Sequence, residues 1–204
     1  MSRPAMRGPA ALILAAAVLT GCAPREVLTP KPGEAPAGVD LSGLWQLAAD
    51  PEAEQRRLDA AVQRAGGNQE SRVLRRVRAP DGREDVVVER RLSGGLVHLF
   101  LHNGKQLKIS QTRAGLFISF DRAVVEEFRF GEHRQVEVGP VIADRVSGWE
   151  GGAYVVETLD ENRMKLTERY ELLSGGDRLR RTIVLRAGNG ESATVVQEFR
   201  RVDD

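Results

Sequence analysis

Several residue types are scarce in this chain, and each scarcity excludes a class of protein. Cys22 is the only cysteine among 204 residues, so no internal disulfide can form. Aromatic residues make up only 5% of the chain. The uncharged, mostly apolar segment Ala10–Thr20 has 11 residues, whereas a membrane-spanning helix takes about 20. No transmembrane segment follows it, so the sequence excludes an integral helical membrane protein.

An excess of either charge is also missing. The chain has 30 basic and 29 acidic residues, which gives a net charge of +1. Two of the basic residues, Arg3 and Arg7, precede the apolar segment, and without them 28 bases face 29 acids. With no basic surplus to neutralise phosphates, nucleic acid is not expected as a partner.

The first 22 residues have the order of an export signal. Arg3 and Arg7 form a positive beginning, and Ala10–Thr20 is an apolar stretch of the length that secretory signals use. The stretch ends in Leu19-Thr20-Gly21-Cys22, which resembles the bacterial lipobox. That resemblance implies a signal peptide over 1–21, lipidation of Cys22 and a membrane anchor. Ala23 resembles the outer-membrane-sorted pattern, so we expect the protein on the periplasmic face of the outer membrane rather than the inner membrane.

Residues 22–39 are expected to form a tether between the anchor and a domain over 40–204. Four prolines fall between Ala23 and Val39 without any apolar period, a composition that favours an extended chain of about 3.1 Å per residue. The domain opens at Asp40. A helix is then predicted from Asp50-Pro51 to Gly66-Gly67, because these pairs provide a start and a stop. Residues 50–104 are therefore interpreted as a helical insertion after the first strand.

From Gln106 onward the sequence predicts short strands. Apolar and polar residues alternate in segments about ten residues apart, and the turns between them are rich in glycine. We expect about eight strands, at 106–111, 116–120, 124–130, 135–143, 154–158, 164–172, 179–186 and 193–202. Closing them into an antiparallel up-and-down β-barrel would remove exposed edges, so a single, mainly β domain is the predicted fold.

Some of these segments also carry a family likeness. Gly43-Leu44-Trp45 resembles the G-x-W opening of lipocalin-like and avidin-like barrels, in which the tryptophan fills the base. The later order is similar to bacterial envelope lipoproteins of unknown activity with a lipocalin-like barrel; it comprises Leu107-Lys108-Ile109-Ser110-Gln111, Gly148-Trp149-Glu150-Gly151-Gly152, Tyr154-Val155-Val156-Glu157 and Glu168-Arg169-Tyr170-Glu171-Leu172. The resemblance implies a fold and an enclosed cavity, and no activity.

The hairpin around Gly175-Gly176 contains the main candidate site. A two-residue turn there pairs Tyr170 with Arg181 and puts Glu168 on the diagonal, all on the apolar face of their strands. One interpretation is a polar cluster that orients a ligand in the barrel. The alternatives are a structural ion pair at one end of the barrel, or a register that turns both charges outward.

Other candidates have simpler interpretations. His98 and His102 would share a helix face but lie too far apart on a strand to bind one ion, so no metal site is expected. Trp149 either stacks a ligand at the barrel mouth or covers the core, like Trp45 at the base. No nucleophile elbow or phosphate loop is present, and the thiol of Cys22 is used by the lipid. No catalytic residues and no cofactor are predicted.

These observations lead to two hypotheses about function. The first is a non-enzymatic lipoprotein, anchored to a membrane, whose barrel holds a small apolar ligand or an acyl chain. The alternative is an envelope interaction or structural module with a protein partner and a barrel filled by its own side chains. A cavity of several hundred Å³ favours the first hypothesis. A filled barrel with an exposed apolar patch favours the second.

Overall fold

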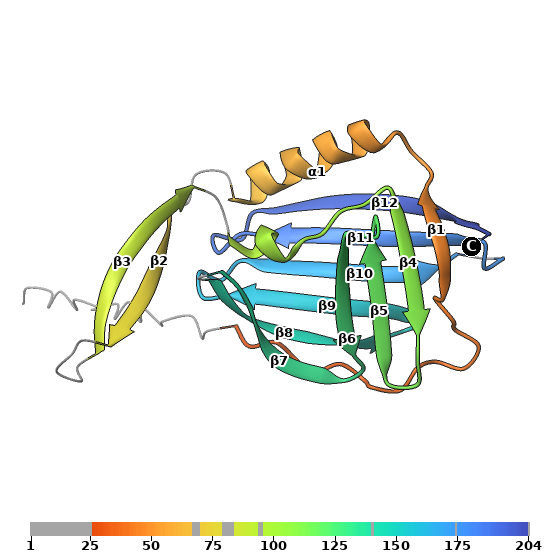
Figure 1. The fold of residues 1–204 in the computed structure, drawn as a ribbon, viewed down its shortest axis with the longest axis horizontal. Helices are drawn as coiled ribbons and strands as arrows, with labels where there is room; N and C mark the ends of the chain where they lie inside the picture. Colours follow the sequence, from red (N-terminus) through yellow and green to blue (C-terminus); the bar gives the residue numbers. More distant parts are fainter. Residues whose placement is uncertain are drawn as a thin grey trace, which may run out of the picture.

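One antiparallel β-sheet of ten strands makes up most of the molecule. In this computed structural model the described residues are 26–66, 70–78, 84–93, 96–139, 141–173 and 175–203. The strands of the sheet are β1 (Gly43–Leu47), β4 (Gln106–Gln111), β5 (Gly115–Phe120), β6 (Val124–Arg129), β7 (Glu132–Val138), β8 (Val141–Glu150), β9 (Ala153–Asp160), β10 (Lys165–Leu172), β11 (Arg178–Arg186) and β12 (Ser192–Val202). Figure 1 shows them curling into a barrel.

The strand order is β6-β5-β4-β1-β12-β11-β10-β9-β8-β7, with every neighbouring pair antiparallel. The expected up-and-down barrel is therefore confirmed, but it has ten strands and not about eight. The expected strand 135–143 is in fact two, because Gly139, at φ 58°, turns the chain between β7 and β8. Counting β1 gives the tenth strand.

The barrel is nearly closed, since its two end strands, β6 and β7, are joined by a hairpin but not by a backbone ladder. Side chains bridge part of this gap instead. The guanidinium of Arg134 donates to the Glu127 carbonyl at 2.9 Å, and the Ser147 hydroxyl donates to the Arg129 carbonyl at 2.9 Å. These bonds satisfy main-chain groups that an edge strand would otherwise leave without partners.

The insertion after β1 is less helical than the sequence analysis expects. Its single α-helix, α1 (Pro51–Gly66), is followed by β2 (Glu70–Arg78), β3 (Glu84–Ser93) and the short 3₁₀ helix η1 (Leu96–Phe100). β2 and β3 pair with each other as a separate two-stranded sheet. Strand structure fits their residues, since β-branched valines recur in both strands.

α1 begins where the sequence provides a cap. The Asp50 carboxylate accepts a hydrogen bond from the Glu52 amide at 3.1 Å, and Pro51 occupies the first helical position. Leu58, Ala61 and Ala65 lie on its buried face and belong to an apolar cluster that includes side chains from β8, β10, β11 and β12. Together with Phe100 of η1, α1 thus closes one end of the barrel.

A second apolar cluster fills the other end. It includes Trp45, which is fully buried and donates its indole N–H to the Leu41 carbonyl at 3.0 Å. Trp149 lies in the same cluster, in edge-to-face contact with Phe130 and Tyr154. Both tryptophans therefore cover the core at this end, and neither is open to a ligand.

Residues 26–39, which we call the N-terminal strap, lie against the outer face of β8 and β9 and do not extend away as a free tether. Leu28 is buried against Val146 and Leu159. The Trp149 amide donates to the Pro32 carbonyl at 2.9 Å. Gly148 leaves room for this approach, because a Cβ there would lie 2.4 Å from the Pro32 oxygen. The strap runs below the barrel in Figure 1.

The predicted signal peptide, Cys22 and Ala23 lie outside the described residues. In the part of the chain that the structure does describe, no helix combines the length and the apolar character needed to cross a membrane.

Replacing Trp45 by alanine should lower the free energy of unfolding by about 3–5 kcal/mol, the usual range for emptying a core aromatic site. Denaturant unfolding of the purified protein measures it. Val196→Ala is a suitable control, because Val196 is 38% exposed on β12. A Trp45→Ala midpoint equal to that of the control would contradict a core role for the indole.

Candidate functional site

A layer of polar side chains crosses the barrel between the two apolar clusters. One side chain comes from β6 and one from each of the five strands β8 to β12. We call these six residues the polar belt: Glu126, Arg145, Thr158, Glu168, Arg181 and Gln197. On β10, β11 and β12 the buried positions alternate with less buried ones and are mostly apolar, while β8 and β9 also bury Ser147 and Asp160. The belt is the only stretch of the described interior where charges gather, and we take it as the candidate site.

Arg181 is at the centre of the belt, and its side chain is fully buried. Its guanidinium donates to both carboxylate oxygens of Glu168, at 3.0 and 3.2 Å, and to Gln197 at 3.3 Å. Tyr170 donates its hydroxyl to Glu168 at 3.0 Å. The Arg181 guanidinium also lies 5.1 Å from the ring centroid of Phe120, within cation–π range.

A second ion pair completes the belt on the side of the open edge. Arg145 donates to Glu126 at 3.0 Å and to the Thr158 hydroxyl at 3.1 Å. Its guanidinium is 5.5 Å from the rings of both Phe100 and Phe128. With two arginines against two glutamates, the charges of the belt cancel.

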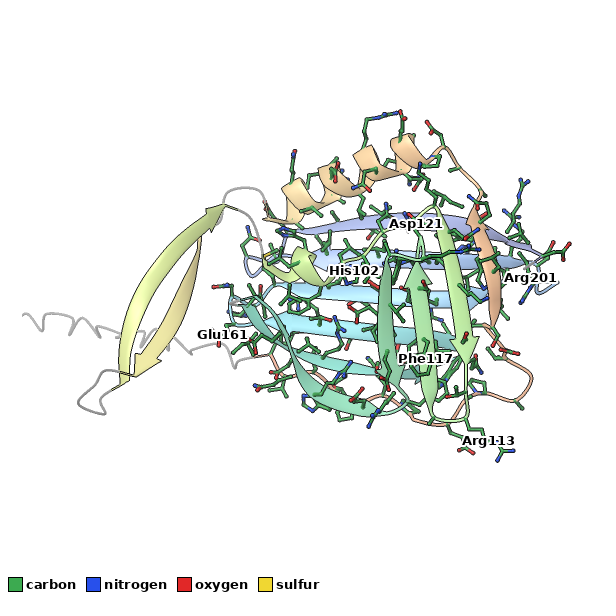
Figure 2. The ribbon with its side chains drawn as sticks, viewed as in Figure 1. His102, Arg113, Phe117, Asp121, Glu161 and Arg201 are labelled. Atoms are coloured by element: carbon green, nitrogen blue, oxygen red, sulfur yellow. The ribbon has the colours of Figure 1, made fainter. Side chains whose placement is uncertain are left out.

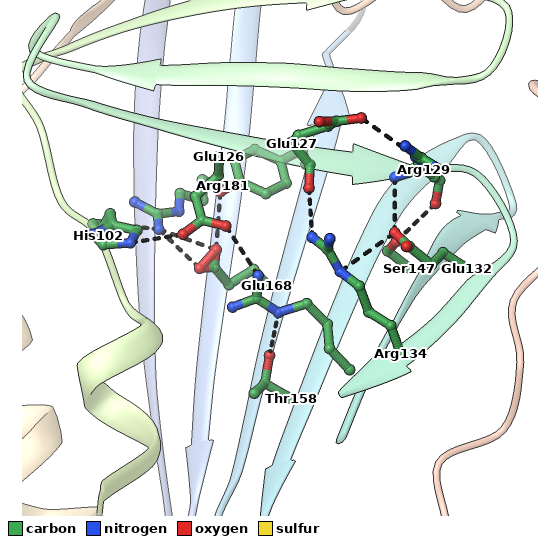
Figure 3. A network of polar contacts seen from close by, with 12 residues as sticks. His102, Glu126, Glu127, Arg129, Glu132, Arg134, Ser147, Thr158, Glu168 and Arg181 are labelled. Carbon is green, nitrogen blue, oxygen red and sulfur yellow. Dashed lines mark hydrogen bonds and ion pairs between the residues drawn. The ribbon is translucent and has the colours of Figure 1, made fainter. Parts of the chain in front are cut away.

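The belt also holds the segment that joins η1 to β4. Arg181 donates to the main-chain carbonyl of His102 at 2.7 Å, while the His102 ring contacts Glu126 at 2.9 Å. Asn103 lies between Gln197, whose amide it accepts at 3.0 Å, and Gln55 of α1, to which it donates at 2.8 Å. Residues 96–105, which cover this end of the barrel, are thereby tied to the belt and to α1 (Figure 3 shows His102 beside Glu126 and Arg181).

Burial and pairing act in opposite directions on these groups. Burial tends to lower the pKa of Arg181, but the negative charge of Glu168 outweighs it and leaves the pKa raised. Burial raises the pKa of Tyr170, so its hydroxyl stays protonated and able to donate. Burial raises the pKa of Glu126 too, yet contacts with His102 and Arg145 leave it lowered. Arg181 and Glu126 therefore keep their ionised forms at neutral pH, and Tyr170 keeps its proton.

Almost no free space remains beside these side chains. The cavity against the belt measures about 10 Å³, roughly the volume that one water molecule needs. The larger hollows are open grooves outside the barrel, along α1: one of about 660 Å³ beside Arg57, Arg64 and Thr194, and one of about 550 Å³ beside Leu58, Val62 and Leu101. Among the described residues, the side chains beside the belt therefore fill the space between them and leave room for about one water molecule.

The structure brings together the residues that the sequence analysis selects from the hairpin. Tyr170 pairs with Arg181, and Glu168 lies on the diagonal, as the turn at Gly175-Gly176 predicts. Their role in ligand binding stays a prediction. His98 and His102 do not form a common site: His102 contacts Glu126, and among the described residues no group of three metal-ligating side chains is found.

Sequence reasoning missed four of the six belt residues: Glu126, Arg145, Thr158 and Gln197. Arg145 shares the inward face of β8 with Ala143 and Trp149. The sequence analysis expects a strand over 135–143 and none over 144–150, so it does not place Arg145 on a strand. Glu126 alternates with Phe128 on β6, a detectable pattern. Nothing local connects His102 or Gln197 to the belt.

Comparisons with known proteins found structural likeness only. No protein-family model and no curated protein matches the chain. Among solved structures, a secretory abundant heat soluble protein from Ramazzottius varieornatus is 12% identical, with 85% of this chain and 100% of that one covered and a TM-score of 0.46. Secretory abundant heat soluble protein 4 from the same organism is 16% identical over 81% and 97% of the two chains, with a TM-score of 0.46.

The fluorescent protein UnaG is a further structural neighbour. It is 14% identical, with 79% of this chain and 97% of that one covered and a TM-score of 0.40. The strand pairings of this chain themselves define its barrel.

The buried pair predicts a coupled effect of mutation. Glu168→Gln and Arg181→Met should each cost about 3–5 kcal/mol, because each leaves the other charge buried without a partner. The double variant should be less destabilised than the sum of the two single changes. A double-mutant cycle in denaturant measures the coupling, and the exposed pair Arg178–Glu198 on neighbouring strands is the control, at about 0–1 kcal/mol. Additive losses at Glu168 and Arg181 would contradict the pairing.

Glu126 predicts a pH dependence of stability. Its folded-state pKa lies below the ordinary value of 4.5, so the unfolded chain takes up its proton first as the pH falls. The stabilisation is therefore complete above about pH 4.5 and lost as the pH falls through the folded-state pKa. The difference in unfolding free energy between wild type and Glu126→Gln should shrink with acidification.

Chemical denaturation from about pH 6 to about pH 3 tests this. Glu127→Gln changes the exposed neighbour on the same strand and serves as the control. A difference between wild type and Glu126→Gln that stays constant over this range would show that Glu126 is not held in its ionised form.

Proposed function

We propose that this protein is a non-enzymatic, lipid-anchored envelope protein that acts through its outer surface, as an interaction or structural module. The observation that carries the proposal is the filled interior. Pockets that bind small molecules measure about 300–1,000 Å³, and the cavity inside this barrel measures about 10 Å³. An acyl chain has no space there unless side chains of the barrel move.

The outer surface offers a contact region that the interior does not. Val125 is 63% exposed and Phe117 40% exposed, on the outer face of the neighbouring strands β6 and β5. Their positions are diagonal in the register, since Phe117 pairs with Glu127 and Val125 with Ser119. In the described residues β6 has no strand on its other side. Exposed apolar groups beside an open edge are typical of surfaces that bind another molecule.

The anchor part of the proposal is supported by the sequence alone. The positive beginning, the apolar stretch of 11 residues and the lipobox-like Leu19-Thr20-Gly21-Cys22 are the supporting features, and Ala23 favours the outer membrane. Stable attachment takes two signals or more, because a single acyl chain binds a membrane only reversibly. We propose a periplasm-facing location on this basis, as in the envelope lipoproteins that the sequence resembles.

A ligand binder is the second candidate. It is favoured by the way in which one end of the barrel is closed. Besides the buried Phe100, residues 96–105 are held by a few side-chain hydrogen bonds: Arg181 and Gln197 donate to them, and Gln55 accepts from Asn103. If this segment moved, a ligand would meet the paired charges of the belt beside aromatic rings. Such a ligand would need polar groups as well as apolar surface.

Native mass spectrometry of the protein released gently from membranes distinguishes the two candidates. We expect the mass of the lipidated polypeptide with no further small molecule, and no binding of benzene by the wild type. Phe199→Ala is the positive control, because it removes a fully buried ring from an apolar cluster, and engineered apolar cavities of about 150 Å³ bind benzene. A stoichiometric co-purifying ligand in the wild type would overturn the proposal in favour of a binder.

A further inference from the structure

The docked strap determines how an anchored barrel is oriented. Three residues separate Cys22 from Glu26, where the strap begins. Even fully extended, this stretch spans about 14 Å. If Cys22 carries the lipid, as the proposed function assumes, Glu26 lies close to the headgroups, and the end of the barrel that holds Glu26 lies there too.

Contacts of the strap identify that end. Glu26 pairs with Arg186, at the end of β11, and with Lys165, at the start of β10, 3.5 Å away. The turns that follow, 161–164 and 187–191, therefore flank the place where the chain leaves the barrel. The first residues of β8 are beside them, since Ala143 pairs with Asp160. Figure 2 shows Glu161 at this end and Arg201 at the opposite one.

The strap is fixed to the barrel by several contacts, so a lipid anchor at Cys22 would also fix which end of the barrel faces the membrane. Besides the buried Leu28, Lys31 pairs with Glu150 at 2.6 Å and with Glu157 at 3.0 Å. Burial tends to lower the pKa of Lys31, but these two carboxylates outweigh it, and the raised pKa keeps the side chain charged. Apolar burial and two ion pairs thus fix the strap along β8 and β9.

Exposed apolar side chains gather at the same end. Val27 is 75% exposed beside the buried Leu28, and Ile142 and Val138 are 43% and 38% exposed at the β7–β8 hairpin. In water the exposed parts of these side chains have no packing partner. At a membrane interface they would be covered by the boundary between headgroups and acyl chains, which stabilises apolar side chains in proportion to the area they bury.

We propose that the barrel end formed by Val27, the β7–β8 hairpin and the turns 161–164 and 187–191 is a docking surface for a phospholipid bilayer. This end of the barrel faces the membrane. The opposite end, with Trp45 and Arg201, and the outer face of β5 and β6 point away from the bilayer. The proposal rests on the anchor in the proposed function, but the orientation depends on the strap.

Proximity of methyl groups to the membrane tests the orientation. The thiol of Cys22, the chain's only cysteine, is coupled to a maleimide-headgroup lipid in phosphatidylcholine nanodiscs, so that the measurement does not depend on lipidation in cells. A gadolinium-chelate lipid then enhances the relaxation of nearby valine and isoleucine methyl groups. We expect at least a several-fold larger enhancement at Val27, Val138 and Ile142 than at Val202, which is 38% exposed near the opposite end.

Three variants test the orientation further, and Val202→Asp is the control among them. Leu28→Asp combined with Lys31→Glu releases the strap, and the difference between the two ends should then disappear. Ile142→Asp should reduce the enhancement at the β7–β8 hairpin, whereas Val202→Asp should leave it unchanged. Equal enhancement at both ends of the wild type, or a larger one at Val202, would overturn the orientation.

The anchor is tested separately in cells. Cys22→Ser should abolish palmitate labelling and membrane fractionation of the chain. Continued attachment and labelling of this variant would refute the anchor in the proposed function, while the nanodisc result would still decide on the docking surface.

Discussion

The ion pair between Arg181 and Glu168 is the interaction on which the interior of this barrel depends. It lies between two apolar clusters, where water cannot solvate either charge. Taking two charges out of water costs several kcal/mol for each, and mutual attraction offsets that cost only where the remaining polar atoms also find partners. Tyr170, Gln197 and the His102 carbonyl supply such partners, whereas the buried Nε of Arg181 has none among the described residues. Loss of one partner would therefore affect the whole belt.

The same requirement links parts of the chain that are distant in sequence. The carbonyl of His102 belongs to the segment that covers one end of the barrel, and Gln197 belongs to the last strand. Arg145 and Glu126 form the second pair, on the side where β6 and β7 do not meet. Polar contacts thus specify how the end segment closes, which apolar packing alone defines less uniquely. This arrangement leaves little free volume, because the side chains that hydrogen-bond to the charges also fill the cavity.

Because the interior is filled, contacts with other molecules would be made by the outer surface. The strap covers part of β8 and β9, α1 and residues 96–105 cover one end, and β5 and β6 leave Phe117 and Val125 exposed. A short connection between a docked strap and a lipid would place the barrel on the bilayer in one orientation. The outer face of β5 and β6 would then point away from the bilayer and be accessible to another protein. Under the proposed function, anchoring and surface recognition would thereby be parts of one arrangement.

The sequence by itself determined the local features of this protein. Alternation of apolar and polar residues predicted the antiparallel strands, Asp50-Pro51 predicted the start of α1, and the glycines at 175 and 176 predicted the pairing of Tyr170 with Arg181. Each of these depends on residues close together in the chain, so period and turn chemistry are sufficient. The division of 135–143 at Gly139 was also local, but the glycine turn there was overlooked.

Only the tertiary structure decided the rest. Proline-rich residues 26–39 indicate an extended chain, and the same extended conformation fits equally a free tether or a strap that packs on β8 and β9. Glu126 and His102 look like surface residues until the barrel closes and brings them beside Arg145 and Arg181. Whether the interior is hollow or filled depends on which long side chains point into the same layer from six strands. Composition and periodicity contain no information on such long-range contacts, because those contacts are set by packing across the whole barrel.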